Sequence, residues 1–370
     1  MTAPEKDRDV EWMEQALVEA KKGWPSPNPH VGVVIVKDGA IIARGHHERA
    51  GDDHAEVAAL KAAGPAAAGA TLYATLEPCN HHGRTPPCTE AIVTAGIGRV
   101  VIGCADPNPH VEGGGAARLA AAGIAVTVGV LEDQAARTIR AFTKHVTSGM
   151  PYVSVKLALS LDGRIATRTG ASKWVTGPLA RAKVHALRGE HDGVAVGIGT
   201  ALADDPRLTV RDAPGRSPLR IVFDTRLRLP LSSRLVTTAS AHPVCVLCTD
   251  VASPEAEEAL IARGVHVVRA ARSTDGRVDV AAGLMEVAKL GVVRLMVEGG
   301  AELAGSFLAS QLADELHAFL APLLLGPRGR PGAVDWAGPA TLAEAPRIES
   351  PRWELVGEDA YVHGRIAYPT

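Results

Sequence analysis

The sequence lacks the features that mark secreted and membrane-spanning proteins. Its five cysteines are odd in number and sparse for 370 residues, so we expect no disulfide framework. It contains no run of about 18 apolar residues that could span a membrane. The charged residues 1–8 do not have the pattern of a signal peptide. We therefore expect a cytoplasmic protein with no membrane partner.

The sequence also lacks an excess of basic or aromatic residues. Lys and Arg together number 39 and Asp and Glu 41, a formal net charge of −2, which cannot neutralise a nucleic-acid backbone. Aromatic residues make up 4% of the chain, which leaves little material for stacking on bases. The 46% of hydrophobic residues is typical of a globular chain. We expect a small-molecule ligand and no nucleic-acid partner.

Helix-like and strand-like segments alternate along the first part of the chain. Apolar residues at helical spacing predict helices over 10–20, 55–63, 89–95, 116–122 and 132–146. Short apolar runs predict strands over 31–36, 40–43, 71–75, 99–103 and 124–130, the first two as a hairpin around Lys37-Asp38-Gly39. This alternation predicts an α/β layered sandwich with parallel strands.

A Gly-Met-Pro break after Ser148 divides the chain. We place a first domain over residues 1–148 and a second over 151–370. Within the second domain, strands are predicted over 152–157, 193–196, 219–223, 244–247, 265–268 and 294–297. Helices are predicted between them over 179–188, 255–263 and 280–290. The second domain is therefore also predicted to be α/β.

Three residues with soft ligand atoms lie at predicted helix starts or strand ends: His54, Cys79 and Cys88. One His and two Cys leave the fourth position of a tetrahedral Zn²⁺ for the water that hydrolysis needs. Glu56 lies at the same helix start as His54, where it can shuttle protons between this water and a leaving group. The competing interpretation is a closed, structural zinc site completed by His46 or His81, which would leave Glu56 without a role.

The motif His54-Ala55-Glu56, followed by Pro78-Cys79, resembles the zinc deaminases that act on cytosine-like rings. Their signature has two residues between the cysteines, whereas this chain has eight, Asn80–Pro87. That longer loop resembles one family, the riboflavin-biosynthesis pyrimidine deaminase/reductases. The resemblance implies that the pyrimidine and its ribose phosphate are held by Asn28, His46, His81 and Arg84. The fork of an Arg side chain also suits a phosphate.

The second domain carries motifs for a different chemistry. Leu202 stands where a third glycine would follow Gly197 and Gly199, so a Rossmann dinucleotide site is excluded. A predicted strand runs into Gly299-Gly300 before a helix, whose free backbone N–H groups could hold a pyrophosphate. Lys156 lies inside an apolar strand, which is costly unless its ammonium faces a site. We assign it a substrate-orienting or proton-donating role.

These motifs occur in the order of the reductase domain of the same family, whose fold is similar to dihydrofolate reductase. The resemblance thus implies a cytidine-deaminase-like three-layer α/β/α domain followed by a dihydrofolate-reductase-like α/β domain. The NADPH positions that it implies are Ala158, Trp174, Thr200, Asp204, Thr225, Gly300, Ala301, Glu302, Leu303, Ala304, Gly305 and Ser306. The substrate positions that it implies are Ser172, Arg188, Leu208, Arg211 and Glu298.

The expected function is therefore bifunctional. Zinc-dependent hydrolysis would deaminate 2,5-diamino-6-(5-phosphoribosylamino)pyrimidin-4(3H)-one, and NADPH would then reduce its ribose to a ribityl chain. Arg188 and Arg211 are expected to hold the substrate phosphate during reduction, and the enzyme is expected to be a homo-oligomer. A nucleic-acid-editing deaminase is the alternative that the charge and aromatic content oppose, and a non-enzymatic zinc scaffold is the third hypothesis.

Overall fold

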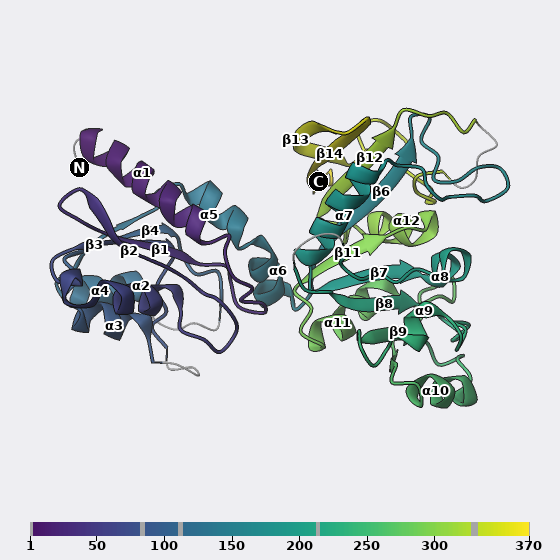
Figure 1. Ribbon diagram of the computed structural model, residues 1–370, viewed down its shortest axis with the longest axis horizontal. Coiled ribbons are helices and arrows are strands. Elements are labelled where there is room, and N and C mark those ends of the chain that lie inside the picture. Colours follow the sequence, from purple (N-terminus) through teal and green to yellow (C-terminus); the bar gives the residue numbers. More distant parts are fainter. Residues whose placement is uncertain (1–2, 82–85, 110–113, 212–214, 327–331, 370) are drawn as a thin grey trace. The chain divides into compact units, whose positions relative to one another are not determined.

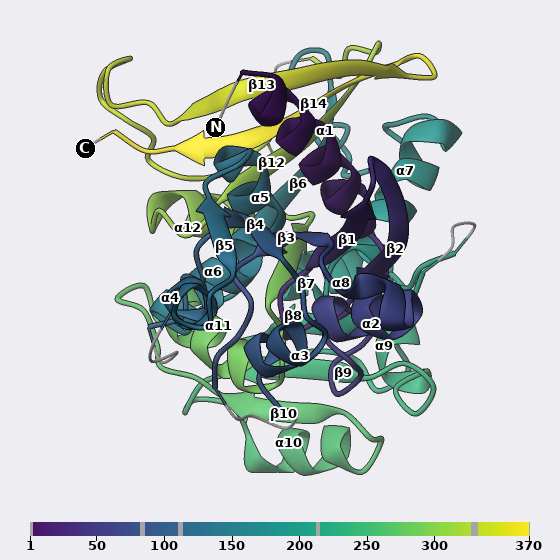
Figure 2. The same cartoon turned by 90° about the vertical axis from the view of Figure 1, so that its left-hand side faces the viewer.

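The chain divides into two structural units, Met1–Gly149 and Met150–Thr370 (Figures 1 and 2). This computed structural model describes residues 3–81, 86–109, 114–211, 215–326 and 332–369. Both units combine helices with a β-sheet, as the sequence predicted. Within the described ranges, every helix is too short or too polar to cross a bilayer.

The sheet of the first unit has the strand order β2-β1-β3-β4-β5. Its strands are β1 (Gly32–Lys37), β2 (Ala40–His46), β3 (Thr71–Leu76), β4 (Arg99–Cys104) and β5 (Ala125–Val128). The predicted hairpin is confirmed, because β1 and β2 pair in antiparallel fashion around Asp38 and Gly39, which both have positive φ.

The prediction of parallel strands is correct only for β3, β4 and β5. β1 runs antiparallel to β3 as well as to β2. The hairpin causes this difference. Because the chain reverses between β1 and β2, the helical crossover that leaves β2 returns with β3 parallel to β2 and antiparallel to β1.

Helices cover both faces of this sheet (Figure 1). The helices are α1 (Ala3–Glu19), α2 (Ala55–Ala63), α3 (Cys88–Thr94), α4 (Gly115–Ala121), α5 (Glu132–Thr138) and α6 (Arg140–Ser148), with a short 3₁₀ turn over Gly64–Ala67. The single helix predicted over 132–146 is wrong. Ile139 leaves helical geometry at φ −106° and ψ 11° and is buried in the core, so the segment forms α5 and α6.

A close backbone contact fixes where α2 begins. A Cβ atom on Gly45 would lie 2.3 Å from the carbonyl oxygen of Ala55, so only glycine lets the first turn of α2 approach β2 this closely. That first turn carries His54 at its N-cap and Glu56. The packing of α2 on β2 therefore positions two of the predicted site residues.

The sheet of the second unit has the strand order β10-β9-β8-β7-β11-β6-β12-β14-β13. Its strands are β6 (Tyr152–Ser160), β7 (Gly193–Gly197), β8 (Leu219–Phe223), β9 (Val244–Cys248), β10 (His266–Arg269), β11 (Arg294–Glu298), β12 (Glu315–Ala321), β13 (Arg347–Val356) and β14 (Asp359–Ala367). From β10 to β12 in this spatial order, each strand runs parallel to its neighbour. β14 pairs antiparallel with β12, and β13 pairs antiparallel with β14.

The helices of the second unit are α7 (Pro178–Gly189), α8 (Ile198–Asp204), α9 (Arg234–Thr237), α10 (Pro254–Ile261), α11 (Val280–Lys289) and α12 (Ala301–Ala309). One core packs residues of α7, such as Val184, against Met296 and Phe319 of the sheet. The other packs Leu284 of α11 and Phe307 of α12 on the opposite face. Because parallel strands end at one edge, the turns after β7, β8 and β11 meet there.

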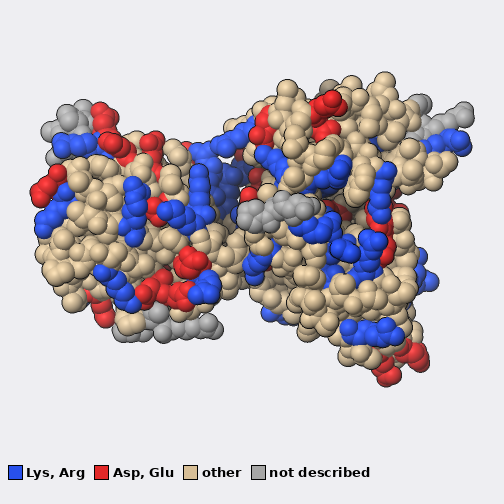
Figure 3. Space-filling view, viewed as in Figure 1, with Lys and Arg blue, Asp and Glu red and all other residues tan. Residues whose placement is uncertain are grey.

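Apolar periodicity did not predict β12, β13 or β14. β13 is exposed along almost its whole length, so it has no buried face to produce an alternating pattern. Figure 3 shows acidic and basic side chains interspersed with uncharged ones on the visible face of each unit.

Candidate active sites

The structure brings His54, Cys79 and Cys88 together, and their ligand atoms all lie within 4.8 Å of one another. His54 Nδ1 is 3.6 Å from Cys79 Sγ and 3.3 Å from Cys88 Sγ. Tetrahedral zinc, with bonds of about 2.0–2.3 Å to nitrogen and sulfur, needs ligand atoms roughly 3.5 Å apart. The spacing and the chemistry of these donors therefore fit a zinc ion.

The two thiols of this cluster shift each other's pKa in opposite directions. A hydrogen bond from Cys88 lowers the pKa of Cys79 to about 4, and the same bond raises the pKa of Cys88. The backbone N–H of Cys88, at the start of α3, also donates to Cys79 Sγ at 3.3 Å. A helix start favours a thiolate, so Cys79 is held in the form that binds a metal.

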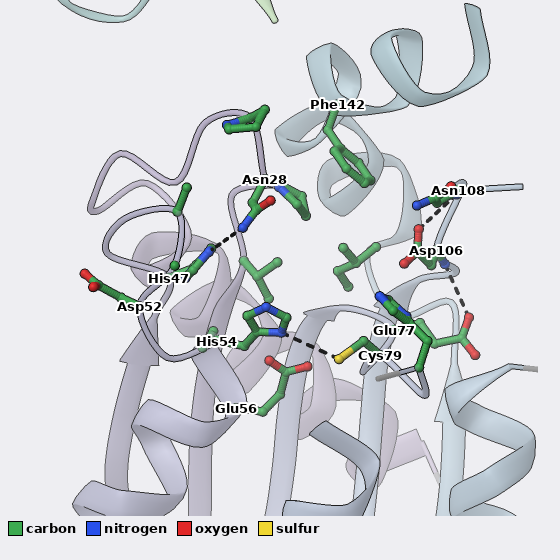
Figure 4. Close-up of a pocket in the computed structure, with 18 residues that line it drawn as sticks. Asn28, His47, Asp52, His54, Glu56, Glu77, Cys79, Asp106, Asn108 and Phe142 are labelled. Atoms are coloured by element: carbon green, nitrogen blue, oxygen red, sulfur yellow. Dashed lines mark hydrogen bonds between the residues drawn. The ribbon is translucent and has the colours of Figure 1, made fainter. Parts of the chain in front are cut away.

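Glu56 lies beside the cluster and is 4% exposed. Burial is the main cause that raises its pKa, to about 7. Figure 4 shows its carboxylate below His54, on the floor of a pocket. A carboxyl group with a pKa near neutrality suits general acid and base catalysis.

The pocket above this floor is lined by residues from several elements (Figure 4), namely Pro27, Asn28, Pro29, Val31, His47, Ala50, Gly51, Asp52, His54, Ala55, Glu56, Leu76, Glu77, Cys79, His81, Asp106, Asn108 and Phe142. Of the substrate positions implied by the family resemblance, Asn28 and His81 are in this lining. Arg84 lies outside the described residues.

His46 is not part of the pocket lining, whereas its neighbour His47 is. The ring of His46 contacts Glu48 at 2.8 Å and Glu19 at 3.7 Å instead. His47 is 3% exposed, and its Nδ1 donates to the carbonyl of Asp53 at 3.0 Å. His47 directly follows the end of β2 and lines the pocket, and a substrate contact by His46 stays a prediction.

His47 also orients Asn28. With Nδ1 donating, His47 Nε2 accepts a hydrogen bond of 2.9 Å from Asn28 Nδ2. Burial lowers the pKa of His47, which agrees with a neutral ring that accepts this bond. The Asn28 amide is thereby fixed with one N–H engaged and its oxygen available to the pocket.

Sequence reasoning missed Asp106, Asn108, Glu77 and Phe142. Asp106 and Asn108 follow the end of β4, next to the end of its parallel neighbour β3, where polar side chains converge. The position of Asp106 and Asn108 directly after a strand end was the sequence signal that could have identified them. Glu77 accepts from the backbone N–H groups of Asp106 and Ala116 and so holds this loop. Figure 4 shows Phe142, from α6, facing the pocket from the side opposite Glu56.

In the second unit, Lys156 and Glu298 are register partners on the adjacent parallel strands β6 and β11. Arg188, from α7, donates through Nε and Nη2 to the two Glu298 oxygens at 2.5 and 2.9 Å, and through Nη1 to the Thr209 carbonyl at 3.1 Å. The Arg188 and Glu298 side chains are 12% and 8% exposed. They form a buried bidentate ion pair beside Lys156.

The charges of this ion pair shift the pKa of Glu298 and of the neighbouring Lys156. Burial alone would raise the pKa of Glu298, but the Arg188 charge and its hydrogen bonds lower it, to about 2. Burial lowers the pKa of Lys156, while the charge of Glu298 partly offsets that effect. Three of the five Arg188 N–H donors are engaged within the protein, and its role as a ligand of the substrate phosphate stays a prediction.

A second group of predicted positions lies around the end of α8. Ser172 Oγ donates to Asp204 Oδ1 at 3.0 Å, and Lys173 Nζ donates to the Asp204 carbonyl at 2.7 Å. Trp174 is exposed, with the Arg181 guanidinium 4.7 Å from its ring centroid. The loop over 172–174 is thus fastened to α8.

The turn into α12 was predicted from the sequence to hold a pyrophosphate. Gly299 and Gly300 have φ of +69° and +78°, and a Cβ on either would lie 3.0–3.1 Å from the Thr200 side chain. Glycines at both positions therefore let this turn approach Thr200 closely where it enters α12. Of the predicted cofactor positions in α12, Ala301, Leu303, Ala304 and Gly305 are buried, whereas Glu302 is exposed.

The remaining predicted positions are spread over several elements. Ala158 is half-buried in β6, and Leu208 is buried. Thr225 follows β8, and its Oγ1 accepts a hydrogen bond from the backbone N–H of Val278. Arg211 is exposed, and its backbone N–H donates to His185 Nδ1 at 3.2 Å.

Two family models match the chain, one in each unit. The model described as cytidine and deoxycytidylate deaminase zinc-binding region matches residues 6–104. The model described as RibD C-terminal domain matches residues 151–362.

Curated relatives match nearly the whole length. The riboflavin biosynthesis protein RibD of Aquifex aeolicus is 41% identical, over 96% of this chain and 97% of that protein. The protein of the same name from Escherichia coli is 40% identical, over 96% of this chain and 99% of that protein.

Solved structures match over the same extent. Form 1 of Acinetobacter baumannii RibD is 39% identical with a TM-score of 0.86, covering 98% of this chain and 99% of that one. The Thermotoga maritima diaminohydroxyphosphoribosylaminopyrimidine deaminase/5-amino-6-(5-phosphoribosylamino)uracil reductase is 34% identical with a TM-score of 0.85, covering 98% and 100%.

Proposed function

The chain belongs to the RibD family of bifunctional riboflavin-biosynthesis enzymes, and from this premise we propose which of its residues carry out deamination and reduction. The first reaction hydrolyses an amino group from a diaminopyrimidinone ribosyl phosphate, and the second uses NADPH to reduce its ribose. We propose that residues 1–148 perform the first reaction and residues 151–370 the second. The observation that carries the proposal is the convergence of His54, Cys79 and Cys88 above Glu56 in one pocket.

For deamination, we propose that His54, Cys79 and Cys88 hold zinc, which when bound supplies an activated water at neutral pH. Glu56 accepts a proton from the attacking water and passes it to the leaving amino group. Asn28, oriented by His47, accepts a hydrogen bond from the pyrimidine ring. His81, Asp106 and Asn108 contact the polar substituents of the substrate in the same pocket.

For reduction, we propose that Lys156 orients the opened sugar and donates a proton to it. Glu298 holds the Lys156 ammonium through their adjacent positions in the sheet, and Arg188 in turn fixes Glu298. NADPH, when bound, supplies the hydride. The glycine turn at Gly299-Gly300 and the first turn of α12 hold its pyrophosphate, with Thr200 alongside. Ser172, Arg188, Leu208 and Arg211 remain predicted substrate contacts.

A direct assay tests the function. The purified protein is incubated with the diaminopyrimidinone ribosyl phosphate, with and without NADPH, and the products are identified by mass. We expect the deaminated compound alone without NADPH and its ribityl form with NADPH. A homo-oligomeric state and a cytoplasmic location also remain predictions.

Metal content tests the ligand set. We expect one zinc per chain, and we expect Cys88→Ala to lose both the zinc and deamination while reduction of the deaminated substrate continues, because the reductase residues lie in the other unit. The matched control is Cys104→Ala, since Cys104 is also buried but its thiol donates to the Thr75 carbonyl and is not part of the His54-Cys79-Cys88 cluster. Zinc-free wild-type protein with full deaminase activity would contradict the assignment.

Expression of one part of the chain tests the division of labour. Each unit has its own hydrophobic core, so residues 151–370 expressed alone should fold. We expect this part to oxidise NADPH with the deaminated substrate and to be inactive in deamination. A folded, soluble product that does not oxidise NADPH with that substrate would count against independent active sites.

A further inference from the structure

Arg220 of β8 carries a positive charge that is completely buried. Its side chain is 0% exposed, and burial lowers its pKa to about 10. Among the described residues, its guanidinium donates only to carbonyl and hydroxyl oxygens. A charge buried without a charged partner destabilises a fold, so an apolar residue would be the more stable choice at this position. The presence of an arginine therefore points to a specific task for its hydrogen bonds.

The Arg220 guanidinium joins two separate segments of the chain. On one side, Nη2 donates to the carbonyls of Leu235 and Thr238, each at 3.2 Å, and to that of His242, at and after the C-terminal end of α9. On the other side, Nη1 donates to the Arg207 carbonyl at 3.3 Å and also to Thr238 Oγ1 at 2.8 Å. Arg220 thus fastens the backbone at residue 207 to β8 and to the end of α9.

A second buried arginine holds the same segment two residues further along the chain. Arg188 donates through Nη1 to the Thr209 carbonyl at 3.1 Å, and through Nε and Nη2 to Glu298. A guanidinium therefore holds the carbonyl before Leu208 and another holds the carbonyl after it. Leu208 has a φ of +53°, a left-handed conformation that is unfavourable for a residue with a Cβ and that its surroundings have to impose.

The side chain and the backbone of Leu208 have different surroundings. The side chain is 3% exposed and belongs to the same core cluster as Val184 and Leu187 of α7. The Leu208 backbone N–H and carbonyl make no hydrogen bond to any other described residue. Since the side chain is enclosed in the core, the substrate contact predicted for Leu208 falls to these two backbone groups.

We infer that Arg220 is a positioning residue of the reductase site, which fixes the backbone around Leu208 so that its free N–H and carbonyl bind the substrate. The inference rests on the proposed function, in which Leu208 contacts the substrate of reduction. Arg188 anchors one end of this segment beside Glu298, and Arg220 anchors the other end. A guanidinium suits this task because its rigid fork of donors holds several carbonyls at once, and backbone groups fixed in advance lose little entropy on binding.

Steady-state reduction by the full-length, zinc-loaded protein tests this inference with Arg220→Lys and Arg220→Gln. Lysine keeps the charge and glutamine keeps an N–H donor group, but neither has the fork that joins both segments. KM for the deaminated substrate should rise about 10-fold, as expected for the loss of two backbone hydrogen bonds. We expect kcat and the dissociation constant of NADPH to stay within about threefold, because only substrate binding is weakened.

Thr238→Val is the matched control, since it removes one acceptor of Arg220 at the end of α9 and leaves the Arg207 carbonyl in place. It should leave KM within about threefold of the wild type. NADPH binding, measured by titration calorimetry, shows whether the second unit of each variant is folded.

A merely structural role for Arg220 predicts different results. The inference is overturned if a folded Arg220 variant keeps the wild-type KM, if kcat falls without a rise in KM, or if Thr238→Val raises KM as much. It is also overturned if neither Arg220 variant binds NADPH, because Arg220 then supports the whole second unit. Wild-type protein that does not reduce the deaminated substrate would instead contradict the proposed function.

Discussion

Replacing Glu56 by glutamine should lower kcat for deamination by about 10²- to 10⁴-fold, the usual contribution of a positioned acid or base, and leave the zinc content at one per chain. Glutamine keeps the size of the side chain, but it cannot accept and release the proton that moves from water to the leaving amino group. Glu56 is buried beside the ligands without being one of them, so the metal should stay. The measurements are steady-state deamination and metal analysis of the same preparation.

Two controls accompany this variant. The Glu56→Gln variant should reduce the deaminated substrate at the wild-type rate, because Glu56 lies in the first unit and the proposed reductase residues lie in the second. Asp52→Asn removes another acid that lines the pocket but points away from it and pairs with Arg49 (Figure 4). Deamination by Asp52→Asn should change by less than about threefold, as is usual for exposed ion pairs. Full deaminase activity in Glu56→Gln would show that another group moves the proton.

Arg188→Met should destabilise the second unit by about 3–5 kcal/mol and abolish reduction, because it leaves the Glu298 carboxylate buried without its partner. The loss should also depend on pH. In the folded wild type the Arg188 charge lowers the pKa of Glu298 to about 2, whereas the unfolded value is about 4.3. The ion pair therefore stabilises the fold fully above about pH 4.3, and this stabilisation is lost as the pH falls towards 2. Denaturant unfolding of the wild type and the variant between pH 3 and pH 7 measures the difference.

A compensating variant separates stability from activity. Arg188→Met combined with Glu298→Gln removes both charges, so much of the lost stability should return while reduction stays impaired. Deamination should be unchanged in both variants. If Arg188→Met lowers the free energy of unfolding by less than about 1 kcal/mol, Arg188 is a solvated charge of the kind found at exposed ion pairs. If it weakens only substrate binding, Arg188 holds the phosphate after all.

The sequence by itself determined the features that depend on short stretches of chain. The hairpin around Asp38-Gly39 and the helix that begins after His54 follow from turn chemistry and apolar spacing, which act between near neighbours. The candidate metal ligands His54, Cys79 and Cys88 could be named for a related reason, since a zinc site needs particular residue types and this chain has few cysteines. The resemblance to the reductase domain of the family also rests on short motifs and on their order along the chain.

Only the tertiary structure decided the contacts that join distant segments. Asn28 is oriented by His47, Asp106 joins the pocket because β3 and β4 are parallel neighbours, and Arg188 is bound by Glu298 across 110 positions of sequence. A local sequence pattern does not predict these pairs. Whether a buried hydrogen bond or ion pair forms depends on which groups the packed helices and strands bring together. The sequence specifies the chemical groups, and the packing of α2, α7 and the two sheets determines which of them meet.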